Sequence, residues 1–168
     1  MDLSGSMKNG DPYFLLRSYC RTAKIKSKAY GYSERSYRDM YKYLTYPLIL
    51  LSATNTILSG FTEHPYIVMG IAFSSLVLVG FNQSICPKDK EHMACTVKVE
   101  FGEISGNVKQ FIMENNKTVE EVKNYSALIH EQLQIWNGLS PPIRDIFVKK
   151  AEELYIDRHR SHSKESKV

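Results

Sequence analysis

Two long stretches of this sequence carry no charged side chain. Leu44 to Phe61 and Tyr66 to Ile85 are separated only by Thr62-Glu63-His64-Pro65. At a rise of about 1.5 Å per helical residue, roughly 20 residues cross the ~30 Å hydrocarbon layer of a bilayer. Because lipid offers no hydrogen bonds to the backbone, such a segment must be helical. We therefore expect a transmembrane helical hairpin over residues 44–85, with spans at 44–61 and 66–85.

The average composition conceals this pattern. A mean hydropathy of -0.32, 24% charged residues and a net charge of +4 would also suit a soluble domain. In a soluble protein the two stretches would be core helices, apolar on every side. The rest of a 168-residue chain could hardly cover both of them, so the membrane interpretation is favoured over the soluble one.

The flanking charges predict the orientation of the hairpin. Basic residues are frequent in cytoplasmic segments next to a span. Lys88 and Lys90 follow the second stretch, and the connector has no Lys or Arg. We expect two spans with both termini in the cytoplasm, and six basic residues before the first span at the membrane surface: Lys24, Lys26, Lys28, Arg35, Arg38 and Lys42.

The two stretches contain more polar and small residues than a passive anchor needs. Ser52, Thr56 and Gly60 recur every four residues, as do Gly70 and Ser74. Small residues let membrane helices approach closely. These stripes either pack the two hairpin helices on each other or join the hairpins of several copies. In the second case, Asn55 near mid-depth would face a polar seam or a small pore, and the protein would be a homo-oligomer.

The segment before the first span has two parts. Residues 1–12 are polar and glycine-containing, so we expect a flexible N-terminus. Residues 13–43 alternate apolar and basic residues at near-helical spacing, which predicts an amphipathic basic helix with an interruption at Gly31. Pro47 predicts a kink or a helix restart near Tyr46. Tyrosines beside a membrane explain this basic segment better than nucleic acid does, so no nucleic-acid partner is expected.

Residues 86–158 predict a cytoplasmic helical region. A helix begins at Pro87, and its apolar stripe is Val97, Phe101, Ile104, Val108, Phe111 and Ile112. Thr118 and Glu121 form a capping box for the next helix, whose stripe is Val122, Tyr125, Leu128 or Ile129, Leu133 and Trp136. A last helix is expected from Ser140-Pro141, followed by a disordered tail at 159–168. The predicted fold class is all-α.

No catalytic or metal-binding pattern is recognisable. Cys20, Cys86 and Cys95 are too scattered for a zinc site. The histidines have no ligand spacing of the HExxH kind: His64, His92, His130, His159 and His162. Cys86 is either a plain thiol or a palmitoylation site at the membrane boundary. We expect no enzymatic activity, no cofactor and no metal.

Two segments support a resemblance to a known family. Tyr37 to Ala53 leads into the first span with Pro47 near its start, and Pro87-Lys88-Asp89-Lys90-Glu91-His92 follows the second span ahead of a long amphipathic helix. This arrangement resembles the SLATT family of two-transmembrane proteins, and in particular its short stand-alone members in large DNA viruses. The likeness covers roughly residues 13–155.

The resemblance implies a membrane effector. Family members coupled to nucleotide-sensing systems are thought to open pores that kill the host cell, and this chain carries no nucleotide-sensing domain. We therefore expect an oligomeric pore-forming or channel-like protein. The alternative is a structural or scaffolding protein of a virion or host membrane that does not conduct and that binds other membrane or virion proteins.

Overall fold

The computed structural model describes residues 13–61, 65–114 and 117–165. These residues form helices and no strand, which confirms the all-α prediction. The expected flexible N-terminus at 1–12, most of the connector and Asn115-Asn116 lie outside the described residues. The helices are α1 (Phe14–Phe61), α2 (Pro65–Ile85), α3 (Pro87–Met113), α4 (Val119–Leu139) and α5 (Asp145–Glu165).

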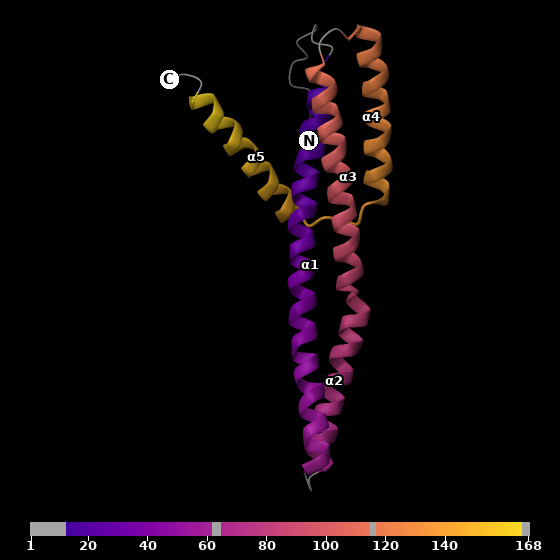
Figure 1. Cartoon of the computed structure of the whole chain (residues 1–168), viewed down its shortest axis with the longest axis vertical. Helices are drawn as coiled ribbons and strands as arrows, with labels where there is room; N and C mark the ends of the chain where they lie inside the picture. The colour runs from indigo at the N-terminus through magenta and orange to yellow at the C-terminus, as the bar shows by residue number, and fades with distance from the viewer. Residues whose placement is uncertain (1–12, 62–64, 115–116, 166–168) are drawn as a thin grey trace.

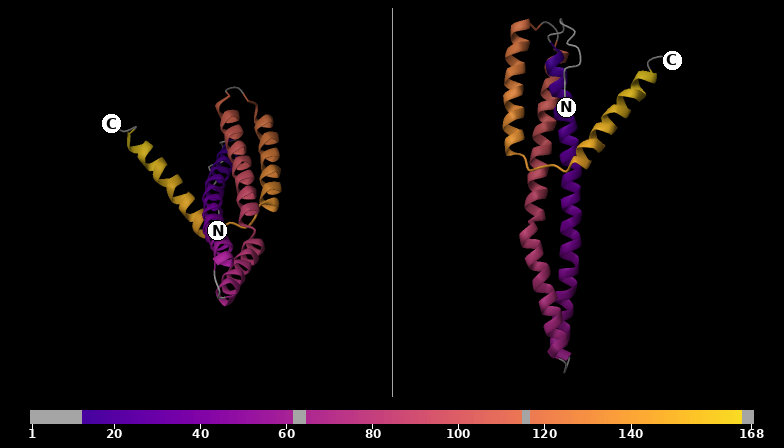
Figure 2. Two further views of the ribbon diagram at one scale, coloured as in Figure 1. Left: turned by 60° about the horizontal axis from the view of Figure 1, so that its bottom comes forward. Right: turned by 180° about the vertical axis from the view of Figure 1, so that it is seen from behind.

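The molecule is a long rod built on α1. Helix α1 runs the full length of the rod, while α2 and α3 lie end to end and antiparallel to it (Figure 1). Helix α4 lies beside the part of α3 that is remote from the hairpin. Helix α5 starts against α1 and diverges from it, as both views in Figure 2 show. The half of the rod that contains α2 is therefore only two helices thick.

A seven-residue repeat explains why α1 is one continuous helix of 48 residues. Every seventh side chain on one face is buried or half-buried, and so is every residue three positions before it. Such spacing keeps one stripe of a helix against an antiparallel partner over many turns. We call this stripe the α1 seam; its first series is Leu16, Ala23, Tyr30, Tyr37, Leu44, Leu51 and Leu58, and its second is Tyr13, Cys20, Ser27, Glu34, Tyr41, Leu48 and Asn55.

The predicted helix restart near Tyr46 is wrong, and so is the interruption at Gly31. Helix α1 passes through both positions. Pro47 is exposed, while Leu44 and Leu48 on either side of it are half-buried in the seam and hold the chain helical. Gly31 lies where α1 and α3 approach, since a Cβ built there would lie 3.5 Å from Lys98 Cδ.

The seam partners on α2 and α3 repeat with the same spacing but not in the same phase. On α2 the residues at this spacing, all half-buried, are Val68, Ile71, Ser75, Leu78, Asn82 and Ile85. On α3 the corresponding residues are Ala94, Val97, Phe101, Ile104, Val108 and Phe111. A helix continuing in phase from α2 would bring Asp89 and His92 into the seam, and both are exposed.

Cys86 resets that phase. It lies between α2 and α3 with φ 44° and ψ 53°, in the left-handed region that side chains other than glycine rarely adopt. Its backbone N–H donates to Asn82 O at 3.1 Å, and its carbonyl accepts from Lys90 N–H at 3.2 Å. The turn rotates the chain so that Pro87 becomes buried at the start of α3. The expected helix start at Pro87 is confirmed.

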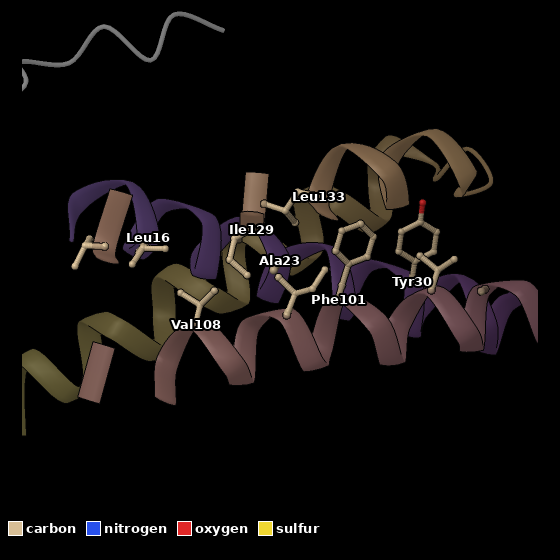
Figure 3. Close-up of a cluster of buried hydrophobic side chains, with 11 residues drawn as sticks. Leu16, Ala23, Tyr30, Phe101, Val108, Ile129 and Leu133 are labelled. Atoms are coloured by element: carbon tan, nitrogen blue, oxygen red, sulfur yellow. The ribbon is translucent and has the colours of Figure 1, made fainter. Parts of the chain in front are cut away.

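The buried core lies where α1, α3 and α4 meet. Leu16, Phe101 and Val108 are fully buried, and Figure 3 shows side chains from all three helices converging. The rings of Tyr30 and Phe101 stack with their centroids 5.9 Å apart. Burying a phenylalanine side chain contributes about 1.5–3 kcal/mol, so this cluster holds the upper half of the rod together.

Helix α4 matches its prediction closely. Thr118 caps it, because its side chain accepts from Glu121 N–H while Glu121 accepts from Thr118 N–H. Of the two residues that the sequence left open for its apolar stripe, Ile129 is buried and Leu128 is exposed. The capping box therefore sets the start of the helix, and the burial of Val122, Ile129 and Leu133 sets its rotation.

The start and end of α5 differ from the prediction. The helix begins at Asp145 rather than at Ser140-Pro141, because Pro142 disfavours helical geometry at the residue before it. Pro141 is held there by Tyr30, whose hydroxyl donates to the Pro141 carbonyl at 2.9 Å. The helix continues to Glu165, where a disordered tail was expected from His159, and no glycine or proline interrupts it.

Candidate functional site

The hairpin of α1 and α2 exposes large apolar side chains on all its outer faces. No residue of α2 is buried. The described residues contain one segment that is long and apolar enough to cross a membrane, Pro65–Met113, whose most apolar 18-residue window has a mean hydropathy of 1.6 and is 0% buried. The exposed residues include Ile49, Leu50, Ile57, Ile67, Met69, Phe73, Leu76 and Phe81. Such a surface is typical of a helix that meets lipid or a partner.

No second segment of this kind is identified in the described part of α1. The lower part of α1 is diluted by hydroxyl and amide side chains, among them Ser52, Thr54, Asn55 and Thr56. Apolar residues outside the seam still lie outward, since Leu50 is 68% and Ile57 is 62% exposed. The structure thus gives one membrane-crossing candidate, while the second span remains a prediction.

The small-residue stripes lie on the outer faces of the hairpin. Ser52, Thr56, Gly60, Gly70 and Ser74 are all exposed. A Cβ built on Gly60 or Gly70 would meet nothing within 4 Å. The hydroxyls are bonded within their own helices, since Thr56 donates to Ser52 O at 3.0 Å and Ser74 donates to Gly70 O at 2.9 Å. The stripes are therefore not what packs α1 on α2.

Asn55 lies in the α1 seam instead. Its Oδ1 atom is buried between the hairpin helices, and so is Thr45 Oγ1, and neither atom has a hydrogen-bond partner in the described part of the chain. An unpaired buried polar atom typically costs about 1–3 kcal/mol. The closed hairpin thus carries a polar defect at Asn55.

The six basic residues proposed for the membrane surface separate into two groups. Because α1 is one helix, Lys24 and Lys28 are about 30 Å and 24 Å along its axis from Leu44. The polar layer of a bilayer is only about 5–8 Å thick on each side. If α1 enters a membrane upright at Leu44, Lys24 and Lys28 lie beyond the polar layer, and Lys42, about 3 Å from Leu44 along the axis, is the basic residue nearest to it. The surface position of the six residues stays a prediction.

Two of these basic side chains serve the fold. Lys26 donates to Asn137 Oδ1 on α4 and lies 5.4 Å from the centroid of the Phe101 ring. Burial lowers the pKa of Lys26 from its usual 10.5. Lys24 lies 5.8 Å from the Tyr155 ring centroid on α5. These cations connect α1 to its neighbours.

An ionic cluster crosses the seam between α1 and α3. Glu34, which is only 7% exposed, accepts from Arg38 Nη2 at 2.6 Å and from Lys98 Nζ at 2.8 Å. Arg38 Nε also donates to Glu91 Oε1 at 2.8 Å. The bond from Lys98, aided by the nearby Arg38, holds the pKa of the Glu34 carboxyl below its usual value of 4.5. Sequence reasoning missed this cluster, although Glu34 falls at a seam position.

The described residues contain no group of three or more His, Cys, Asp and Glu side chains that could hold a metal ion. Cys20, Cys86 and Cys95 are free thiols. The His130 ring packs against Tyr19 in a tilted arrangement with centroids 5.6 Å apart, and His64 lies outside the described residues. The features that carry functional meaning are therefore the apolar hairpin and the charges above it.

Comparisons with protein families, with curated proteins and with solved structures found no match for this chain. The exposed hairpin, its outward stripes and the polar atoms in its seam are the features that bear on function.

Proposed function

We propose that the chain is a two-span integral membrane protein with cytoplasmic termini that self-associates through its hairpin as a pore-forming or channel-like effector, in keeping with the SLATT resemblance. The observation that carries the proposal is the uncharged hairpin, whose large apolar side chains are exposed on α2 and on the lower part of α1. Water would penalise this surface, whereas lipid would not. No enzymatic activity is part of the proposal.

The outward stripes support self-association. Gly70 and Ser74 leave a shallow, unoccupied strip on α2, and Ser52, Thr56 and Gly60 leave another on α1. Small residues of this kind allow helices of neighbouring copies to come into close contact. Asn55 would gain a partner if assembly rearranged the seam, and such bonds between membrane helices contribute about 0.6–2 kcal/mol.

Leakage from liposomes tests conduction. The purified chain is reconstituted into vesicles loaded with a self-quenching dye, and release is measured against protein density. Gly70→Leu fills the outward strip without a clash in the single chain and should reduce leakage strongly, while Ala72→Leu, also exposed on α2, should leave it unchanged. An absence of leakage at every density of the unaltered chain would reject the pore.

Glycosylation tests the orientation. Asn124-Tyr125-Ser126 is an acceptor sequence, and Asn124 is exposed on α4. With cytoplasmic termini this site stays unmodified in a eukaryotic cell. Glycosylation of Asn124 would show that the orientation is the reverse of the one proposed. It would not affect the case for the hairpin.

A scaffolding role is the second candidate. It is favoured by a row of apolar side chains on the outer face of α4, where Leu128 is 49%, Ile135 is 51% and Leu139 is 61% exposed. A virion or membrane protein could dock there. Stoichiometric presence in purified viral particles, together with vesicles that do not leak, would favour this role over the pore.

A further inference from the structure

Two open grooves adjoin each other on the side of α1 that faces α5. Each has a volume of about 530 Å³, and both are lined by Tyr32 and Arg35. One extends along α1 towards Leu44 and includes Phe147 and Lys150 of α5. The other reaches Lys98 of α3. Both grooves include residues of α5, and Figure 1 shows where that helix starts beside α1. We call the two grooves together the α5 furrow.

The α5 furrow has an excess of positive charge. Its lining contains two carboxylates, Glu34 and Asp39. The lining also contains five cationic side chains: Lys28, Arg35, Arg38, Lys98 and Lys150. The hairpin half of the molecule, in contrast, has no charged residue between Leu44 and Phe61 or in α2. A small anion with more than one charge would balance the furrow.

The ionic cluster fixes two of these cations in place. Arg38 uses Nε and one N–H of Nη2 on carboxylates, and Lys98 uses one N–H on Glu34. A guanidinium has five N–H donors and an ammonium has three, so both groups keep donors for a ligand. Their positions are set by a nearly buried carboxylate before any ligand arrives, which lowers the entropy cost of binding.

Two further cations, Arg35 and Lys150, line the groove that extends towards Leu44. Arg35 is exposed and makes no ion pair among the described residues. Lys150 lies 4.9 Å from the centroid of the Tyr32 ring, which itself packs on Phe147 at 6.5 Å. This contact attaches α5 to α1 and brings a cation of each helix to the same opening.

We propose that the α5 furrow binds a compact ligand with two or more phosphate charges. Guanidinium groups match phosphate oxygens in a two-pronged geometry, and lysines add point charge. The volume is in the range of small-molecule sites. Such a group can be free in the cytoplasm or can belong to a lipid headgroup that stands well above the bilayer. The inference goes beyond the proposed pore and does not depend on conduction.

Binding is tested with the full chain in nanodiscs of phosphatidylcholine. Isothermal titration calorimetry with sodium pyrophosphate tests the free source. Native mass spectrometry of protein from nanodiscs that contain phosphatidylinositol bisphosphate tests the lipid source. The variant Arg35→Gln with Lys150→Gln should weaken binding at least tenfold, since hydrogen bonds to charged groups are worth about that factor each.

The matched control removes the same charge elsewhere. Lys123→Gln with Lys149→Gln changes two exposed lysines that do not line the furrow, and binding should stay within twofold of the unaltered chain. The proposal is supported if pyrophosphate or the lipid binds and if only the Arg35 and Lys150 variant weakens that binding. The probe that binds then identifies the source of the ligand. If neither probe binds, or if both variants weaken binding equally, the proposal is overturned while the leakage result stands unaffected.

Discussion

The two halves of α1 use one packing geometry in two different settings. From Tyr13 to Tyr41 the seam meets α3 and forms a core with α4, in which Leu16, Ala23 and Phe101 have no exposed surface. From Leu44 to Leu58 the same seven-residue spacing meets α2, and no described side chain becomes buried. The seam therefore sets how the helices pair, whereas the outer faces determine which surroundings each half tolerates.

The difference also separates two kinds of stability. The upper half excludes water with its own side chains, as a soluble bundle does. The lower half leaves its apolar surface exposed, as is typical of helices that meet lipid or a partner. Truncating an apolar side chain should consequently have the larger effect in the upper half. Placing a charge on an outer face should have the larger effect in the lower half.

The largest effect is expected from emptying the core. Phe101→Ala removes a fully buried ring and should destabilise the bundle by about 3–5 kcal/mol. Phe73→Ala on α2, where the ring is 67% exposed, should change the free energy of unfolding by no more than about 0.5 kcal/mol. Urea unfolding followed by the fluorescence of Trp136, the single tryptophan, measures the difference. Equal costs would mean that the two halves do not differ in environment.

A charge on an outer face gives the reverse contrast. Leu76→Arg places a cation at the middle of the exposed hairpin face and should oppose membrane insertion by about 2.5–3.5 kcal/mol. Val99→Arg, at an exposed position on α3, should be neutral. Resistance to alkaline extraction from membranes provides the measurement. Unchanged extraction of the Leu76 variant would contradict a lipid-facing hairpin.

The ionic cluster should make the upper half sensitive to acid. Because the folded-state pKa of Glu34 is lowered, its stabilisation is fully present above the unfolded value near 4.5 and is lost as the pH falls through the folded value. Glu34→Gln should cost roughly 1–2 kcal/mol at neutral pH and flatten this acid dependence. Glu103→Gln, at an exposed position on α3, serves as the control in urea titrations at several pH values.

The smallest effect concerns the junction between the halves. Cys86 carries a left-handed backbone, which costs a non-glycine residue about 1–2 kcal/mol. Cys86→Gly should stabilise the chain by about 1 kcal/mol, and Cys86→Val should destabilise it. Cys86→Ala removes the thiol while keeping the backbone geometry, so it isolates the contribution of Sγ, which donates to Gln83 O at 2.6 Å. Thermal unfolding that ranks valine above glycine would contradict the strain.

Sequence reasoning succeeded where the signal was local. The helix start at Pro87, the capping box at Thr118 and the apolar stripe from Val97 to Val108 all appear in the structure. Each depends on residues within about three turns of one helix, so neighbours in sequence carry all the information.

Sequence reasoning failed where one continuous helix joins a charged half to an uncharged half. The change from basic to apolar composition at Leu44 suggested a boundary, and Pro47 suggested a break, yet the seam repeat from Leu16 to Leu58 overrides both. A count of residues at intervals of seven would have revealed it. The outward placement of Gly70 and the α5 furrow could not be predicted, because both depend on the rotation of α2 and on where α5 leaves α1.

Because α1 is one continuous helix, a tilt at one end of it moves the other end. From Leu44 to Phe14 the helix extends about 45 Å, with no described break at which motion could be absorbed. A change of 10° in the tilt of its lower part would move the far end sideways by roughly 8 Å, carrying α3 and α4 along. A rearrangement that tilts the hairpin therefore displaces the opposite end of the rod.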